Sequence, residues 1–184
     1  MTRRAILLDR DGTLNVCAAP HEYVATVDAF EWLPGAPQAL ARLARAGYAL
    51  GVASNQRGVA RGLIEPAALA QIEQRIQDDL RPLGAAIDAF RYCPHDHADA
   101  CDCRKPKPGL LRMLADDLDI DLERSWMVGD SASDVEAGRA VGCRTALVGT
   151  ATTSPAPDLS VDSLAQFAEL LESADRPLSE AGSA

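Results

Sequence analysis

The alternation of short apolar segments with longer helical segments is the feature that most constrains the fold. Five apolar runs predict strands, at residues 4–9, 48–54, 87–93, 125–130 and 144–149. Five further stretches have helical patterning, at residues 36–47, 65–84, 107–120, 131–142 and about 162–172. Strands as apolar as these are typical of a parallel sheet covered by helices on both faces. The sequence therefore predicts an α/β protein, with three Rossmann-like α/β/α layers and a central parallel sheet.

Polar side chains cluster directly after the predicted strands. In a parallel sheet these positions share one edge, where ligands bind. A single polar residue there fits an ordinary loop, but four such loops at one edge favour a functional site. The residues are Asp9 and Asp11 after the first strand, Ser54, Asn55 and Gln56 after the second, Cys93 and His95 after the third, and Asp130 after the fourth.

The first of these groups is a pair of aspartates two positions apart. Side chains at residues 9 and 11 of a strand point the same way, so Asp9 and Asp11 could converge on a hard cation such as Mg²⁺. At the end of the strand, Asp11 could instead offer its backbone carbonyl. On its own, a D-x-D pattern fits a pair of turn or N-cap aspartates better than a metal site.

The string D-R-D-G-T-L at 9–14, together with G-D-S-A-S-D at 129–134, resembles the haloacid-dehalogenase-like phosphohydrolases from about Arg4 to Thr150. The resemblance implies a HAD-like fold in which Asp9 attacks phosphorus and forms an aspartyl-phosphate. Asp11 would act as acid and base, while Asp9, Asp11 and Asp130 would hold Mg²⁺. We expect Asp134, one helical turn beyond Asp130, to support these ligands from outside.

The same resemblance assigns the remaining catalytic and substrate-binding residues. Ser54 would hold the transferring phosphoryl group, and Lys105, in the string R-K-P, would stabilise its charge. We expect Lys107 to be a solvated charge at a helix start. The residues expected to bind substrate are Asn55, Gln56, Arg57, Arg104 and Ser131.

The segment C-P-H-D-H-A-D-A-C-D-C at 93–103 has the pattern C-x-H-x5-C-x-C. Three thiolates and an imidazole suit tetrahedral Zn²⁺, although isolated cysteines are more often inert core residues. The segment resembles the zinc loop of the bacterial heptose-bisphosphate and histidinol-phosphate phosphatases. That resemblance implies a structural zinc, with His97 outside the site. Its ligands would be Cys93, His95, Cys101 and Cys103.

The segments where related enzymes insert a lid, residues 12–34 and 58–90, are short here, so we expect a capless enzyme with an open site. The resemblance implies Mg²⁺-dependent removal of the C7 phosphate of a heptose 1,7-bisphosphate, a small phosphorylated sugar. Three alternatives remain at this point: a histidinol-phosphate phosphatase, a phosphoryl transferase, and a non-catalytic zinc-loop relative.

Net charge and hydropathy limit the partners. The net charge of −9 disfavours nucleic acid, because its binders concentrate basic residues. No apolar run approaches the ~20 residues that span a bilayer, and the N-terminal apolar stretch is too short for a signal peptide. We therefore expect a cytoplasmic protein without a membrane partner, and a monomer. One domain is predicted over residues 1–176, followed by a disordered tail at 177–184.

Overall fold

Six parallel strands form one sheet in the order β3-β2-β1-β4-β5-β6. The computed structural model describes residues 2–175, so the predicted tail at 177–184 lies outside the described residues. The order places β1 in the interior of the sheet, between β2 and β4. The strands are β1 (Ala5–Leu8), β2 (Ala49–Asn55), β3 (Ala89–Cys93), β4 (Trp126–Gly129), β5 (Arg144–Val148) and β6 (Leu159–Val161).

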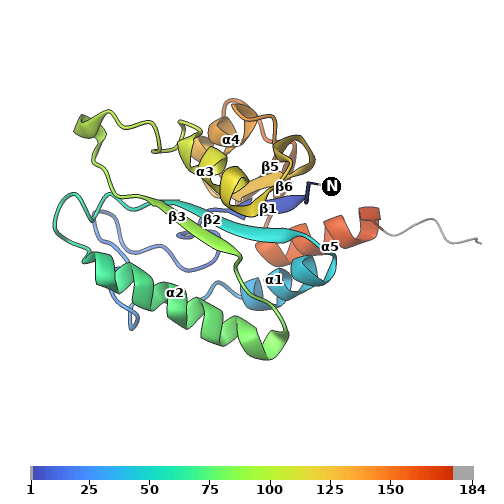
Figure 1. Ribbon diagram of the computed structural model, residues 1–184, viewed down its shortest axis with the longest axis horizontal. Helices are drawn as coiled ribbons and strands as arrows, with labels where there is room; N and C mark the ends of the chain where they lie inside the picture. Colours follow the sequence, from blue (N-terminus) through green and yellow to red (C-terminus); the bar gives the residue numbers. More distant parts are fainter. Residues whose placement is uncertain (1, 176–184) are drawn as a thin grey trace, which may run out of the picture.

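Helices cover both faces of the sheet, which gives the three predicted layers (Figure 1). On one face lie α1 (Ala36–Arg45), α2 (Pro66–Leu80) and α5 (Leu164–Asp175); on the other lie α3 (Gly109–Leu118) and α4 (Ala132–Arg139). Strand β1 contributes side chains to the hydrophobic cores on both faces of the sheet, because successive side chains of a strand point to opposite faces. Ile6 and Leu8 pack in the core under α1, α2 and α5, whereas Ala5 and Leu7 pack under α3.

The five predicted strands and five predicted helices are all present, with ends that differ by a few residues. The predicted helix over 65–84 changes after Leu80 to a 3-10 turn at Arg81–Leu83, because Pro82 has no N–H to continue the α-helix. Strand β6 was not predicted. It has only three residues at the edge of the sheet, too few to produce a recognisable alternation.

The sheet order determines where the site forms. The chain runs outward from β1 through β2 to β3 on one side of the sheet, and outward from β4 through β5 to β6 on the other. The carboxyl ends of β1 and β4 therefore flank the switch point where ligands bind in such sheets. The Asp9 N–H extends this pairing by donating to the Val128 carbonyl at 2.9 Å. Asp9 and Asp130 thus follow neighbouring strands.

The structure contains no cap domain within the described residues. Residues 9–35 contribute only turns and isolated bridges, and α2 with its 3-10 turn fills most of the connection from β2 to β3. Across residues 2–175, no helix combines the length and apolar character needed to cross a membrane.

Candidate active site and metal clusters

Three carboxylates and one lysine meet at the carboxyl edge of β1 and β4. One oxygen each of Asp9, Asp130 and Asp134 lies within 4.8 Å of the others, and we call these residues the acidic cluster. The Lys105 Nζ lies 2.8 Å from Asp9 Oδ1 and 2.6 Å from Asp134 Oδ1. The side chains of Lys105 and Asp134 are almost fully buried. The predicted nucleophile, metal ligand and phosphate-stabilising lysine are therefore brought together.

The acidic cluster carries more negative charge than its lysine neutralises. Burial raises the pKa of Asp9 to about 6, with help from Asp134 and against the attraction of Lys105. Burial, Asp9 and Asp134 together raise the pKa of Asp130 to about 7. The pKa of Lys105 is raised although burial opposes its charge, because Asp134 and Asp9 outweigh that effect. A hard divalent cation fits this set, since carboxylate oxygens are the ligands that Mg²⁺ prefers.

Two glycines permit the close approach of these carboxylates. Gly12 has a φ of +85°, and a Cβ atom there would collide with the carboxylate of Asp130. A Cβ atom at Gly129 would likewise collide with the side chain of Asp134. The glycines of D-R-D-G-T and G-D-S-A-S-D are therefore required by the geometry of the acidic cluster.

Asp134 is fixed by the start of α4. Its Oδ2 accepts hydrogen bonds from the Ser131 N–H at 3.1 Å and from the Ser131 hydroxyl at 2.6 Å, and its Oδ1 faces Lys105. Ser131 was predicted to bind substrate, and its hydroxyl is engaged in holding Asp134. The expectation that Asp134 supports the site agrees with these contacts.

Asp11 lies outside the acidic cluster, with its carboxylate bound by neighbouring donors. Arg10 reaches both oxygens, with Nη2 3.0 Å from Oδ1 and from Oδ2. Asn15 Nδ2 donates to Oδ1 at 2.9 Å, and Gln56 Nε2 donates to Oδ2 at 2.8 Å. The same Gln56 nitrogen donates to Ser54 Oγ at 3.1 Å, so Asp11 and Ser54 lie on one side of the site. Sequence reasoning missed Arg10 and Asn15, although both stand in the string D-R-D-G-T-L-N.

Asn55, predicted to bind substrate, makes two hydrogen bonds to the backbone of Lys105. Its Nδ2 donates to the Lys105 carbonyl at 3.0 Å, and its Oδ1 accepts from the Lys105 N–H at 3.0 Å. Both ends of the amide are therefore used to hold the segment that carries the lysine. Arg57, another predicted substrate residue, forms an ion pair with Asp96 of the neighbouring loop at 3.5 Å.

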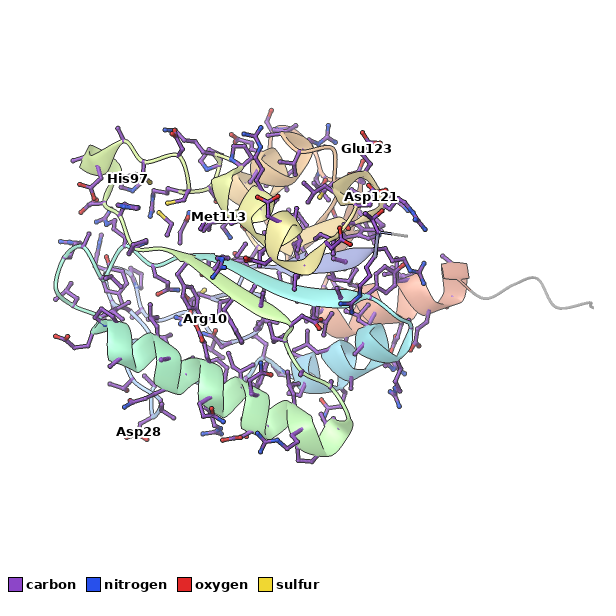
Figure 2. The ribbon with its side chains drawn as sticks, viewed as in Figure 1. Arg10, Asp28, His97, Met113, Asp121 and Glu123 are labelled. Atoms are coloured by element: carbon purple, nitrogen blue, oxygen red, sulfur yellow. The ribbon has the colours of Figure 1, made fainter. Side chains whose placement is uncertain are left out.

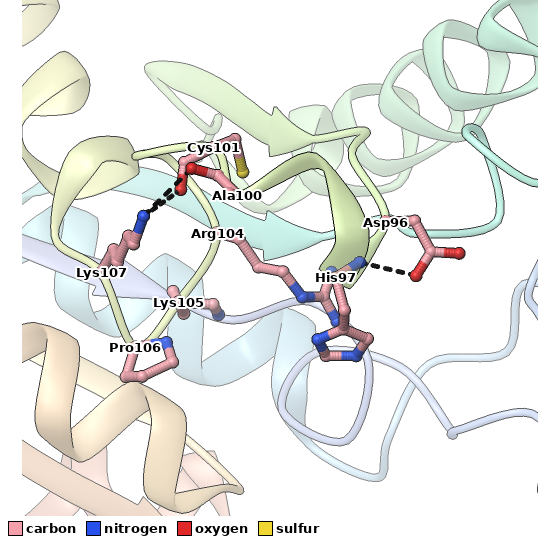
Figure 3. A pocket seen from close by; sticks show the side chains of 8 residues that line it. All are labelled: Asp96, His97, Ala100, Cys101, Arg104, Lys105, Pro106 and Lys107. Atoms are coloured by element: carbon pink, nitrogen blue, oxygen red, sulfur yellow. Dashed lines mark hydrogen bonds between the residues drawn. The ribbon is translucent and has the colours of Figure 1, made fainter.

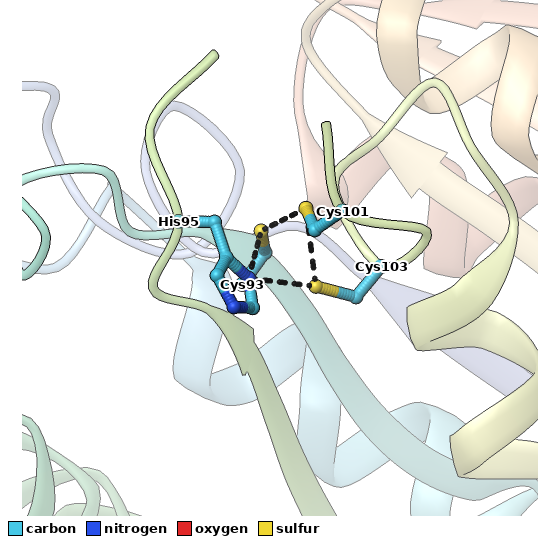
Figure 4. Close-up of side chains that lie close together, drawn as sticks. All are labelled: Cys93, His95, Cys101 and Cys103. Atoms are coloured by element: carbon cyan, nitrogen blue, oxygen red, sulfur yellow. Dashed lines mark hydrogen bonds between the residues drawn. The ribbon is translucent and has the colours of Figure 1, made fainter. Parts of the chain in front are cut away.

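The second cluster gathers the four predicted zinc ligands from the end of β3 and the loop that follows it (Figure 4). The sulfurs of Cys93 and Cys101 lie 3.6 Å apart, and those of Cys101 and Cys103 lie 3.5 Å apart. His95 Nδ1 lies 3.7 Å from the Cys93 sulfur and 3.2 Å from the Cys103 sulfur. Zn–S bonds of about 2.3 Å at tetrahedral angles separate ligand atoms by roughly 3.7 Å, so the cluster suits zinc. His97 is outside it, as expected.

Lys107 is exposed and lies just before α3, as predicted, but its charge also makes contacts that were not predicted. Nζ donates to the carbonyls of Ala100 at 3.3 Å and Cys101 at 2.7 Å. It also pairs with the exposed Asp102 at 3.1 Å. Lys107 therefore ties the zinc loop to the start of α3. The pattern K-P-K-P gave no indication of this, because the contacts depend on the path of the loop.

A cavity of about 260 Å³ lies between the zinc loop and Lys105 (Figure 3). Arg104 extends into it beside His97, and its Nη1 lies 3.5 Å from the carbonyl of the zinc ligand His95. The cavity is rich in cationic side chains and so suits an anionic group. Its lining comprises Asp96, His97, Ala100, Cys101, Arg104, Lys105, Pro106 and Lys107.

Comparison with known proteins agrees with this geometry. Residues 102–172 match the family model described as HAD-hydrolase-like. The D-glycero-beta-D-manno-heptose-1,7-bisphosphate 7-phosphatases of Pseudomonas aeruginosa and Pseudomonas putida are 42% and 41% identical to the chain. These alignments cover 82% and 80% of this chain, and 83% of each relative. The chain belongs to this phosphatase family. It is a HAD-like phosphatase.

A solved structure matches this chain over nearly the full length of both proteins. The crystal structure of D,D-heptose 1,7-bisphosphate phosphatase from Bordetella bronchiseptica, complexed with magnesium and phosphate, superimposes with a TM-score of 0.85 at 37% identity. It covers 93% of this chain and 99% of that one. The acidic cluster of this HAD-like phosphatase is built from the type of ligand that magnesium requires.

Proposed function

We propose that the protein hydrolyses the C7 phosphate of D-glycero-β-D-manno-heptose 1,7-bisphosphate, with Asp9 as nucleophile. The names of its relatives at 35–42% identity support this substrate and this anomer. The observation that carries the proposal is the position of the acidic cluster beside a cavity lined by cationic residues. Lys105 pairs with Asp9 of the acidic cluster and also lines the cavity that contains Arg104, which supports a substrate with two phosphates.

In the first half of the reaction, an Asp9 oxygen attacks phosphorus and the bond from phosphorus to the C7 oxygen breaks. Asp11 gives its proton to the departing oxygen, which leaves as an alcohol. Ser54 and the adjoining backbone N–H groups bind the phosphoryl oxygens, while Lys105 offsets their charge. Contacts between Gln56 and both Asp11 and Ser54 support a shared orientation of the acid and the phosphoryl group.

In the second half, water attacks the phosphorus of the aspartyl-phosphate. Asp11, now a carboxylate, takes the proton from that water, and the bond between Asp9 and phosphorus breaks. Inorganic phosphate leaves and Asp11 is again protonated. Each turnover therefore consumes one water and releases one alcohol and one phosphate.

Two metals have separate tasks in the proposal. Magnesium, when bound, neutralises the charge that would keep a carboxylate away from a phosphate dianion. Asp9, Asp130 and the Asp11 carbonyl are its proposed protein ligands, with Asp134 placed to orient Lys105. Zinc would be held by four protein side chains, which leaves no open position for chemistry. Its task is to fix the loop that carries Arg104.

Specificity for a bisphosphate follows from the cavity beside Lys105. Arg104 can meet the C1 phosphate with a charge-assisted hydrogen bond, and Arg57 and Ser131 remain proposed contacts to the sugar. Histidinol phosphate carries an amine at its far end, which the guanidinium of Arg104 would repel. We therefore place the heptose ester above histidinol phosphate as substrate.

The test is phosphate release from the β and α heptose bisphosphates, histidinol phosphate and a simple sugar monophosphate, each with Mg²⁺. The β bisphosphate should give the highest kcat/KM. Arg104→Ala should lower kcat/KM for the bisphosphate by roughly ten- to a hundredfold, the value of a charged hydrogen bond, while the monophosphate changes little. Arg112→Ala, which removes an exposed arginine of α3, serves as the matched control.

Three outcomes would contradict the proposal. A higher kcat/KM for histidinol phosphate would overturn the choice of substrate. An equal loss on the bisphosphate and the monophosphate in Arg104→Ala would remove Arg104 from recognition of the distal phosphate. Transfer of phosphate to an added sugar instead of water would favour a phosphoryl transferase.

We also infer a monomer that acts in the cytoplasm on a small phosphorylated sugar. All five cysteines are free, which agrees with a reducing compartment. Size-exclusion chromatography coupled to light scattering tests the monomer.

A further inference from the structure

Arg10 is a fully buried cation whose position follows from β1. Side chains alternate along the strand, and Ile6 and Leu8 face the core under α1 and α2. Arg10 continues that series two residues beyond Leu8, and its exposed fraction is 0%. It lies on the side of the sheet covered by α2 (Figure 2). A charged side chain in such a place is costly unless it is paired.

The pairing of Arg10 is directed at one carboxylate. Its Nε and Nη2 donate to Asp11 Oδ1 at 3.2 and 3.0 Å, and Nη2 also contacts Oδ2 at 3.0 Å. Asn15 adds a third donor to Oδ1 at 2.9 Å. Oδ1 is thus bound by Arg10 and Asn15 together. Oδ2 is contacted by Gln56, which also donates to Ser54.

Arg10 Nη2 contacts both oxygens of Asp11, but their other donors differ. Arg10 Nε and Asn15 Nδ2 add two further donors to Oδ1, whereas Oδ2 receives one, from the Gln56 side chain that also contacts Ser54. We propose that Arg10 is a positioning residue for the acid/base: it holds the Oδ1 edge of Asp11, so that Oδ2 carries the proton to and from the reacting oxygens. This rests on the proposed function, in which Asp11 is the acid/base.

The backbone of Arg10 also shapes the turn that follows Asp11. Its carbonyl accepts hydrogen bonds from the N–H groups of Thr13, Leu14 and Asn15, at 3.3, 2.8 and 3.2 Å. The turn that follows Asp11 is thereby built on Arg10, and this turn brings Asn15 back to Oδ1. A lysine could keep the charge but not the fork of donors that spans two carboxylate oxygens.

The experiment compares two esters that differ in their need for an acid. The leaving group of a heptose phosphate is an alkoxide, which requires a proton. The leaving group of p-nitrophenyl phosphate is a stable phenolate, which does not. Arg10→Lys should lower kcat/KM for the sugar ester at least tenfold more than for the aryl ester. Asp11→Asn should shift the same ratio further, and adding Arg10→Lys to Asp11→Asn should change the ratio less than twofold. Arg75→Lys, on the exposed face of α2, is the control and should leave the ratio unchanged.

Equal loss on both esters in Arg10→Lys, or a further shift of the ratio in the double variant, would overturn the role of Arg10. If Asp11→Asn itself shows no preference between the esters, the acid/base assignment fails first, so the two failures are distinguishable. Asn15→Ala covers the case in which Arg10→Lys does not fold. It removes the other side-chain donor to Oδ1 while keeping the buried cation, and should shift the ratio in the same direction by a smaller factor. An unchanged ratio in Asn15→Ala would also overturn the proposal.

Discussion

The acidic cluster and the Cys/His cluster are both metal sites by composition, but they are assembled differently. Asp9 and Asp130 follow two neighbouring strands, β1 and β4, which are far apart in the sequence. The sheet brings the two aspartates together. The four ligands of the Cys/His cluster come from the end of β3 and the loop that follows it. The first therefore depends on the whole fold, whereas the second depends mainly on the path of one loop.

The two clusters also share an electrostatic property. Burial and neighbouring carboxylates raise the pKa values of Asp9 and Asp130, and burial with neighbouring thiols raises the pKa of Cys103 to about 12. Cys101 differs: although burial opposes it, hydrogen bonds from the Arg104 backbone and the neighbouring thiols lower its pKa to about 7. In each case like groups are crowded in a way that a divalent cation would relieve. The difference is that Lys105 pairs with the acidic cluster, which leaves that site suited to an anion as well as a cation.

The largest expected loss of activity comes from a change in the acidic cluster. Asp9→Asn should lower kcat by a factor on the order of 10⁴ or more, because an amide cannot attack phosphorus. Phosphate release at saturating Mg²⁺ measures the loss, and circular dichroism checks the fold. Asp116→Asn, an exposed aspartate of α3, is the matched control and should retain full activity. Turnover of Asp9→Asn within tenfold of the parent would exclude a covalent aspartyl intermediate.

The second-largest loss of activity should come from a change in the Cys/His cluster. Cys101→Ser should lose zinc and lower kcat/KM for the bisphosphate about tenfold or more, because the loop that carries Arg104 loses its support. The thermal unfolding midpoint should fall less than in a core variant, since the sheet is complete without this loop. Metal analysis of protein purified without chelator gives the zinc content.

Cys143→Ala is the control for zinc, because Cys143 is a buried cysteine outside the cluster. It should keep one zinc per chain. A zinc-free Cys101→Ser with full bisphosphate activity would show that the loop positions nothing the reaction needs.

The smallest expected effect comes from Asn55, which joins the two regions by holding Lys105 at the end of the zinc loop. Asn55→Ala should lower kcat about tenfold, because Lys105 loses two backbone hydrogen bonds that fix its place, each worth roughly 1 kcal/mol. KM should change little. Gln74→Ala removes an exposed amide of α2 and is the control. A raised KM with unchanged kcat would instead assign Asn55 to substrate binding, as the sequence first indicated.

The predictions from sequence succeeded where the signal is local or periodic. Apolar runs and helical stretches gave all the α-helices and all the strands except β6, and the C-x-H-x5-C-x-C pattern identified a set of ligands that the structure brings together. Roles that depend on which way a side chain turns were not accessible in this way. Asn55 and Ser131 were expected at the substrate, and nothing in the sequence indicated the hydrogen bonds by which they hold Lys105 and Asp134. Their catalytic and binding roles stay predictions.

The sequence by itself determined the three-layer fold, the family and the ligand types of both clusters, because these depend on residue identity and short spacing. Only the tertiary structure decided that Lys105 pairs with Asp9, 96 residues away, and that Asp134 completes this group. It also decided that the charge of Arg10 is buried beneath Asp11. These contacts arise because parallel strands far apart in sequence end at one edge of the sheet. Neither periodicity nor spacing records which side chains then face each other.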